Sequence, residues 1–151
     1  MRRYLVVANQ TLRSPRLLRE LRARLAEGPC SFHLLVPATV PHAHAFWTEG
    51  EAHAVAEERL DDALLQLAAE AIAASGSVGD ANPIDAVTDL LRREQFDAVI
   101  VSTLPPGLSR WIHQDLPHRL ERRVAMPVRH VITPFGDLRP AGDRHLQRAT
   151  L

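Results

Sequence analysis

Short apolar runs alternate with longer amphipathic stretches along this chain. Runs rich in branched or aromatic side chains have the length of buried strands. They lie at 4–8, 31–36, 96–102 and 128–132, and a weaker strand ends over 77–80. Between them, apolar residues recur every three or four positions, as on one face of a helix. These stretches predict helices at 15–27, 53–75, 83–94 and 108–124, the last interrupted near Pro117.

Local signals set the expected helix boundaries. Ser14-Pro15 and Asn82-Pro83 each place a capping side chain before a first-turn proline. Asp115 is expected to cap a helical segment that restarts at Leu116. Residues 37–52 are expected to form a loop.

Strands that alternate with helices in this order imply parallel strands joined by right-handed crossovers. The sequence therefore predicts a doubly wound, three-layer α/β sandwich with a five-stranded, mostly parallel sheet over residues 1–132. Residues 133–151 mix proline, glycine and charges without periodicity, so a loosely ordered C-terminal tail is expected there. Ligands of such sheets bind beyond the carboxyl ends of the strands, where the strand order reverses. The loops after the first, second and fourth predicted strands are the expected site.

Composition places the chain among globular proteins of one domain. It has 151 residues, of which 46% are hydrophobic and 24% are charged, as expected for a single core of common size. No apolar run approaches the roughly 20 residues of a membrane-spanning helix. The N-terminal run is too short for a signal peptide, and the single cysteine, Cys30, agrees with a reducing compartment. We expect a cytoplasmic protein without a membrane partner.

Charge and residue usage remove several classes of function. The formal net charge is zero, so no strong field attracts nucleic acid, and no nucleic-acid partner is expected. All 18 residues of the lysine-plus-arginine count are arginine, which excludes a P-loop lysine and a Schiff-base lysine. Ser102, Ser109 and His113 form no recognisable arrangement of nucleophile and base. No catalytic residue is assigned, and the chain is not expected to be an enzyme.

The histidines between residues 42 and 53 are a weak metal signal. His42, His44 and His53 stand near Glu49 and Glu51, and these side chains are zinc ligands in other proteins. A His-x-His pair presents both rings on one side only when the segment is extended. Ordinary loop histidines are the expectation, and no metal is assigned.

Three segments together resemble the universal stress protein family. VGDANPIDAV at 78–87 resembles its third strand and helix, FDAVIVST at 96–103 its fourth strand, and Met126-Pro127-Val128 the start of its fifth strand. The three segments follow one another in the same order as in the family, and the resemblance covers nearly all of residues 3–132. It implies a sheet with strand order 3-2-1-4-5. It also implies a homodimer, often formed through the fifth strand, here Val128 to Ile132.

The ATP-binding loop of this family is degraded here. Family members that bind ATP carry glycines and a hydroxyl residue after the fourth strand, and these cradle the phosphates. The corresponding positions hold Val101, Leu104, Gln114 and Asp115, none of which retains the family residue. A carboxylate at Asp115 facing phosphate oxygens would cost about 1–4 kcal/mol. We expect the standard phosphate cradle to be missing.

Part of a ligand cleft is nevertheless expected to persist. Asn9 stands where the family has an aspartate near the adenosine, and Val36 matches a residue whose backbone contacts adenine. No cofactor is assigned, and ATP or another adenine nucleotide is the candidate ligand to test. The candidate ligand-binding residues are Asn9, Gln10, Thr11, Val36, Ser102, Thr103, Gly107, Ser109 and Arg110.

The leading hypothesis is a small binding or regulatory module of the universal stress type, related to the stress response and without the phosphate cradle. It would act through a protein partner or a small-molecule ligand. One alternative is an adenine-nucleotide switch or hydrolase that uses a rearranged loop after the fourth strand. The other is a purely structural interaction protein.

Overall fold

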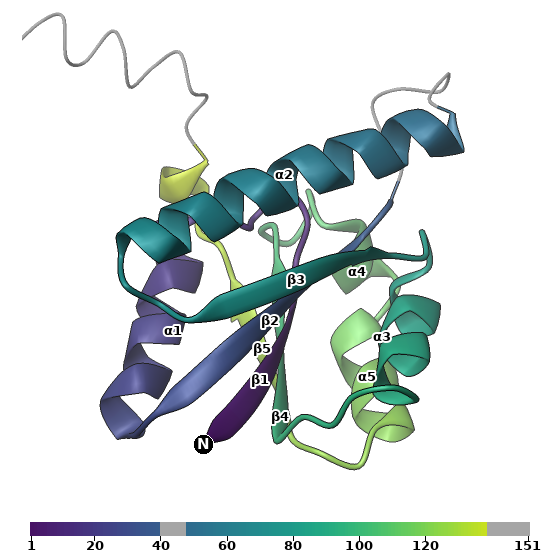
Figure 1. Ribbon diagram of the computed structural model, residues 1–151. Coiled ribbons are helices and arrows are strands. Elements are labelled where there is room, and N and C mark those ends of the chain that lie inside the picture. Colours follow the sequence, from purple (N-terminus) through teal and green to yellow (C-terminus); the bar gives the residue numbers. More distant parts are fainter. Residues whose placement is uncertain (40–47, 139–151) are drawn as a thin grey trace, which may run out of the picture.

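The computed structural model of the protein describes residues 1–39 and 48–138. One five-stranded sheet forms its centre, and all four neighbouring pairs are parallel, in the order β3-β2-β1-β4-β5. The strands are β1 (Arg2–Val7), β2 (Cys30–Pro37), β3 (Ala74–Gly79), β4 (Ala98–Thr103) and β5 (Val128–Ile132) (Figure 1). The predicted α/β fold, the parallel pairing and the strand order are confirmed.

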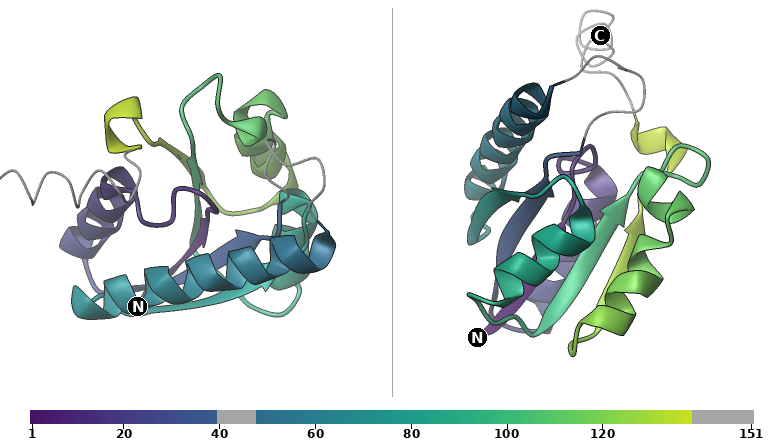
Figure 2. Two further views of the ribbon diagram at one scale, coloured as in Figure 1. Left: turned by 90° about the horizontal axis from the view of Figure 1, so that it is seen from above. Right: turned by 90° about the vertical axis from the view of Figure 1, so that its right-hand side faces the viewer.

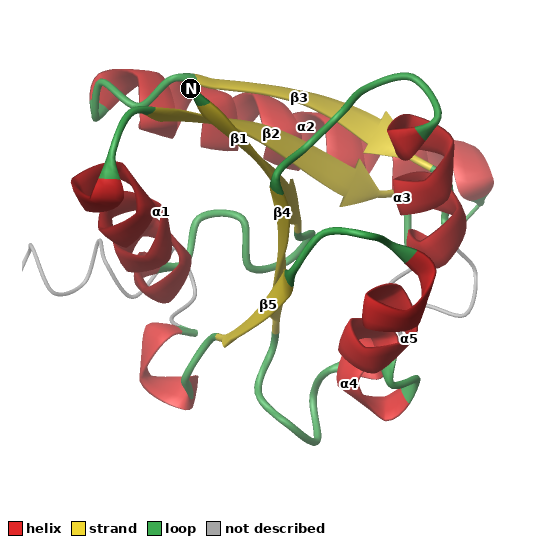
Figure 3. Cartoon of the chain, turned by 90° about the horizontal axis from the view of Figure 1, so that it is seen from below, coloured by secondary structure: helices red, strands yellow, loops and turns green. Residues whose placement is uncertain are grey.

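Helices cover both faces of the sheet. One face carries α1 (Pro15–Glu27) and α2 (Glu49–Ala69), and the other carries α3 (Pro83–Leu91), α4 (Arg110–His113) and α5 (Leu116–Arg123) (Figures 2 and 3). Side chains that alternate along the strands fill the two resulting cores. Leu34 packs with α1 and α2, and its neighbour Leu35 packs with α3. This is the expected three-layer sandwich.

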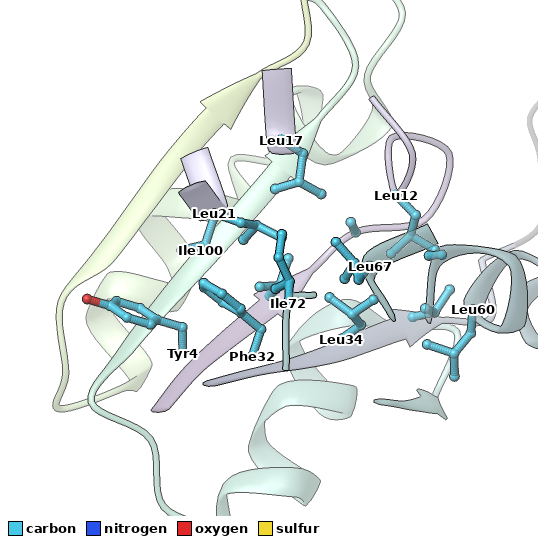
Figure 4. Close-up of a cluster of buried hydrophobic side chains, with 14 of the residues drawn as sticks. Tyr4, Leu12, Leu17, Leu21, Phe32, Leu34, Leu60, Leu67, Ile72 and Ile100 are labelled. Atoms are coloured by element: carbon cyan, nitrogen blue, oxygen red, sulfur yellow. The ribbon is translucent and has the colours of Figure 1, made fainter. Parts of the chain in front are cut away.

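The core beneath α1 and α2 is centred on β1 and β2. Phe32 is buried and stacks on Tyr4, with 5.6 Å between the ring centroids (Figure 4). On the neighbouring strand, a Cβ atom built on Gly76 would lie 2.8 Å from the Leu34 carbonyl oxygen and closer still to Leu60 Cδ1. Glycine at position 76 therefore lets α2 and β2 approach β3 closely.

Two of the predicted helix starts are confirmed in detail. The Ser14 hydroxyl accepts a hydrogen bond from the Leu17 N–H at 3.0 Å, and Pro15 begins α1. The Asn82 side chain accepts from the Ile84 N–H at 2.9 Å at the start of α3. These side chains satisfy amides that the first helical turn leaves without partners.

The predicted limits of the long helix were wrong at both ends. It begins at Glu49, inside the expected loop, because the Thr48 hydroxyl caps the Glu51 N–H at 3.1 Å. It ends at Ala69, and Ala71 then adopts a left-handed φ of 59° that turns the chain away. Residues 74–79 pair with β2. Pairing with β2 overrides the helix propensity of the alanine-rich segment.

The break between α4 and α5 lies where Pro117 was expected to cause one, but Asp115 does not cap α5. Its φ is 56°, and its side chain makes no capping hydrogen bond. The carboxylate instead lies 2.7 Å from His118 Nδ1 and 4.0 Å from Arg122 Nη2. The predicted capping bond was therefore wrong.

The first residue after β5, Thr133, is held by hydrogen bonds to β4 and to the cap of α1. Thr133 is buried, its N–H donates to the Thr103 carbonyl at 2.9 Å, and its hydroxyl donates to the Ser14 hydroxyl at 3.1 Å. A short 3-10 helix follows at Phe135–Asp137. The rest of the expected tail, from residue 139 on, lies outside the described residues. Within residues 1–39 and 48–138, no helix is long and apolar enough to cross a membrane.

Candidate functional site

A small cleft lies at the carboxyl ends of β1 and β4, the two central strands at which the strand order reverses. Its volume is about 80 Å³, whereas sites for whole drug-sized molecules span roughly 300–1,000 Å³. It is lined by Asn9, Gln10, Thr11, Thr39, Ser102, Thr103, Leu104, Leu108, Ser109, Arg110 and Trp111. This is the position at which doubly wound sheets bind ligands.

Most of the residues singled out from the sequence meet in this cleft. Asn9, Gln10, Thr11, Ser102, Thr103, Ser109 and Arg110 all line it. Val36 is fully buried in the sheet. Gly107 has a φ of 92°, and a Cβ built on it would contact nothing within 4 Å. Neither residue lines the cleft. The sequence reasoning missed Thr39, Leu104, Leu108 and Trp111 as lining residues. Thr39 and Leu104 could have been predicted as lining residues, because each follows closely after the carboxyl end of a strand.

The floor of the cleft is a pair of buried hydroxyl groups. Thr11 Oγ1 and Ser102 Oγ lie 2.6 Å apart, and both residues are buried. Next to them, Thr103 Oγ1 lies 2.8 Å from His130 Nε2 of β5. The Thr11–Ser102 contact joins the loop after β1 to β4. The Thr103–His130 contact joins β4 to β5. Each hydroxyl keeps further donor or acceptor capacity for a ligand.

Asn9 is fixed from two sides at the rim of the cleft. Its Nδ2 donates to the Pro37 carbonyl at 2.8 Å, and its Oδ1 accepts from Arg59 Nη1 of α2. Burial lowers the pKa of the Arg59 guanidinium, which is partly offset by the nearby Glu58. An ionised aspartate could not donate to the Pro37 oxygen. The structure thus gives a physical reason for asparagine at this position.

The loop between β4 and α4 offers few backbone amides to a ligand. Pro105 and Pro106 have no N–H. The N–H groups of Leu108 and Ser109 both donate to the Pro105 carbonyl, at 3.0 and 3.1 Å. The Ile112 N–H is capped by the Ser109 hydroxyl at 3.1 Å. A phosphate cradle is built from such amides, and here those of Leu108, Ser109 and Ile112 are already bonded within the loop and α4.

Asp115 does not oppose a ligand in the way the sequence suggested. It is not part of the cleft lining, and its exposed carboxylate faces His118 and Arg122. Gln114 is also exposed and lies outside the lining. The bonded loop amides therefore bear on phosphate binding more directly than Asp115 does.

The lining supplies hydroxyls, amides, apolar surface and one cationic side chain, Arg110. The lining residues within 1–39 and 48–138 include no carboxylate, histidine or cysteine. Over the part of the chain that the structure describes, no group of three histidine, cysteine or acidic side chains could hold a metal. His53 pairs with Glu57, with 3.1 Å from Nε2 to Oε1. His42 and His44 lie outside the described residues.

A buried histidine, His33, and a partly buried one, His130, predict a dependence of stability on pH. His33 bridges Ser75 and Ser77, with ring nitrogens 3.1 and 2.9 Å from their hydroxyls, and desolvation lowers its pKa. Desolvation also lowers the pKa of His130. The folded state thus resists protonation that the unfolded chain accepts at about pH 6.5. The free energy of unfolding should have its highest value above pH 6.5. It should fall as the pH drops from 6.5 through the lowered pKa values of the folded state.

Urea unfolding at pH 7.5 and 5.5 measures this effect. His33→Gln and His130→Gln should each flatten the pH dependence, and the double variant should flatten it most. The exposed His118, whose pKa is raised by its hydrogen bond to Asp115, acts in the opposite direction. An unchanged slope in the double variant would contradict the assignment.

Comparison with known proteins gives a likeness of fold. No protein-family model matches the chain, and no curated protein matches it in sequence. Among solved structures it is similar to the universal stress protein from Archaeoglobus fulgidus. The TM-score is 0.54 at 17% sequence identity, over 87% of this chain and 93% of that chain. The chain therefore has the doubly wound, five-stranded fold of a universal stress protein.

Proposed function

We propose that this chain is a binding or regulatory module related to the stress response, whose cleft takes the neutral, polar end of a nucleoside-like ligand. The observation that carries the proposal is the hydrogen-bonding inventory of the cleft. Hydroxyls of Thr11, Ser102 and Thr103 line it, while the Leu108 and Ser109 amides of the adjoining loop are bonded to Pro105. Such a site supports binding of sugar hydroxyls better than binding of a triphosphate.

The size of the cleft supports the same ligand class. About 80 Å³ suits one polar group, such as a ribose ring, and not a whole nucleotide. Trp111 and Leu108 add apolar surface beside the hydroxyls, a combination of many small-molecule sites. Among the described residues that line the cleft there is no histidine or carboxylate to act as a general base, which favours a binding role over the hydrolase alternative.

Thermal unfolding with adenosine and with Mg-ATP, each at millimolar concentration, tests the proposal. A ligand that binds only the folded state stabilises it by about 2.7 kcal/mol at 100 times its Kd, or roughly 5–10 °C for a domain of this size. We expect adenosine to raise the Tm and Mg-ATP to raise it no further. Thr11→Val should remove most of the adenosine shift, because valine keeps the shape but loses the hydroxyl.

The matched control is Thr88→Val. Thr88 lies on α3 and bonds only to the Asp85 carbonyl at 3.2 Å, outside the cleft, so this variant should keep the full shift. A much larger shift with Mg-ATP than with adenosine would overturn the proposal in favour of the nucleotide switch. No shift with either compound would favour the structural interaction protein. The homodimer through Val128 to Ile132 stays a prediction.

A further inference from the structure

A broad groove lies at the opposite end of the sheet from the cleft, where the strands begin. Two adjoining hollows of about 530 and 500 Å³ form it. They share Arg2, Tyr4, Arg24, Glu27 and Asp97, so they are parts of one groove. Each is several times larger than the cleft and falls within the roughly 300–1,000 Å³ of small-molecule sites. Figure 3 views the molecule from this end.

The floor of the groove is apolar. Tyr4, Ala98 and Ile100 belong to the core beneath α1, and the same three residues line the groove. They come from the beginnings of β1 and β4, beside the last turn of α1, which contributes Arg24 and Glu27. An apolar ligand body would therefore meet the edge of the core here.

One buried carboxylate holds two arginines at the wall of the groove. Glu20 of α1 has a side chain only 2% exposed, and its Oε1 accepts from Arg129 Nε of β5 at 2.5 Å. Its Oε2 lies 3.2 Å from Arg24 Nε. Arg129 is 53% exposed. A guanidinium held through Nε keeps its two terminal amino groups for another acceptor.

The acidic groups of the groove are already engaged. Glu27 pairs with Arg24 Nη1 at 2.9 Å, and Asp97 accepts from the Arg3 backbone N–H at 2.8 Å. Within the described chain, Glu20 is the only hydrogen-bond or ion-pair partner of Arg129, and the contact is made through Arg129 Nε. Glu27 and Asp97 each keep a second carboxylate oxygen as an acceptor, whereas the terminal amino groups of Arg129 are donors that lie next to an apolar floor.

We propose that this groove is a second binding site, for a small amphiphilic anion with an apolar body and a carboxylate, phosphate or sulfonate group. The acid group binds the exposed fork of Arg129, in the paired geometry that guanidinium groups favour. The apolar body lies over Tyr4, Ala98 and Ile100. The inference is independent of the nucleoside proposed for the cleft.

The test uses two dyes that share one ring system. 1-Anilinonaphthalene-8-sulfonate carries a sulfonate, and N-phenyl-1-naphthylamine is the same framework without it. The sulfonate dye should bind the native protein with enhanced fluorescence and shift the backbone NMR signals of Tyr4, Ala98 and Arg129. Arg129→Gln should weaken its binding roughly tenfold, the size of one charged hydrogen-bonding contact. Ala98→Leu, which fills the groove, should weaken both dyes.

Arg123→Gln is the matched control, because Arg123 is exposed at the end of α5 and lines neither hollow. Near-UV circular dichroism shows whether each variant keeps its native packing. The proposal is overturned if the NMR shifts map elsewhere or are absent, if Arg123→Gln weakens binding as much as Arg129→Gln, or if both dyes bind equally well.

Discussion

Phe32→Ala is expected to lower the free energy of unfolding by about 3–5 kcal/mol, the usual cost of removing a buried phenylalanine side chain. The ring is 2% exposed and stacks on Tyr4 in the core beneath α1 and α2. The surrounding strands cannot close the resulting cavity, because β1, β2 and β3 are held together by their backbone pairing. Urea unfolding of the variant and of the natural chain gives the difference.

Phe135→Ala is the control with the same chemistry. Phe135 lies in the short helix after β5 and is 65% exposed, so its loss should change stability by no more than about 0.5 kcal/mol. Equal effects of the two substitutions would contradict the core described here. The same pair separates a packing effect from a general effect of losing an aromatic ring.

Gly76→Ala is expected to cost about 1–3 kcal/mol, although alanine is otherwise favoured over glycine within strands. The added Cβ would lie 2.8 Å from the Leu34 carbonyl oxygen, which is backbone of the paired strand and has little freedom to move. Leu60 on α2 blocks the other direction. The urea midpoint should fall while the denaturant slope stays unchanged.

Gly50→Ala is the matched control for this substitution. Gly50 lies in the first turn of α2, and a Cβ there would be 3.9 Å from the Thr48 hydroxyl, its nearest neighbour among the residues that the structure describes. Alanine should leave stability unchanged or raise it by up to about 1 kcal/mol. A loss at position 50 as large as that at position 76 would show that the crowding around Gly76 is not the cause.

The strands that could be predicted from the sequence are those with buried, branched side chains. Residues 96–102 read as a strand because both faces of β4 are covered, so the whole run is apolar. β3 carries Ala-Ser-Gly-Ser-Val-Gly and has no such signal. Its formation depends on pairing with β2 and on the hydrogen bonds that join His33 with Ser75 and Ser77. Those contacts exist only after the chain has folded.

The cleft was predictable for a different reason. The rule that ligands bind at the carboxyl ends of parallel strands was enough to select Thr11 and Ser102. It could not select Trp111, because that depends on how the proline-containing loop brings α4 over the sheet. The partnership of Asn9 with Arg59, 50 positions later, was also beyond reach, since no local pattern joins a strand end to the middle of a distant helix.

The position of Thr133 matters for anyone who shortens or fuses this chain. A boundary drawn after the last strand, at Ile132, would remove a residue that bonds both to Ser14, the cap of α1, and to the Thr103 carbonyl beside the cleft. Such a fragment would keep every strand but would lose the two hydrogen bonds that join the end of β5 to the cap of α1 and to β4. A boundary at Leu138 instead keeps Thr133 and both of these hydrogen bonds.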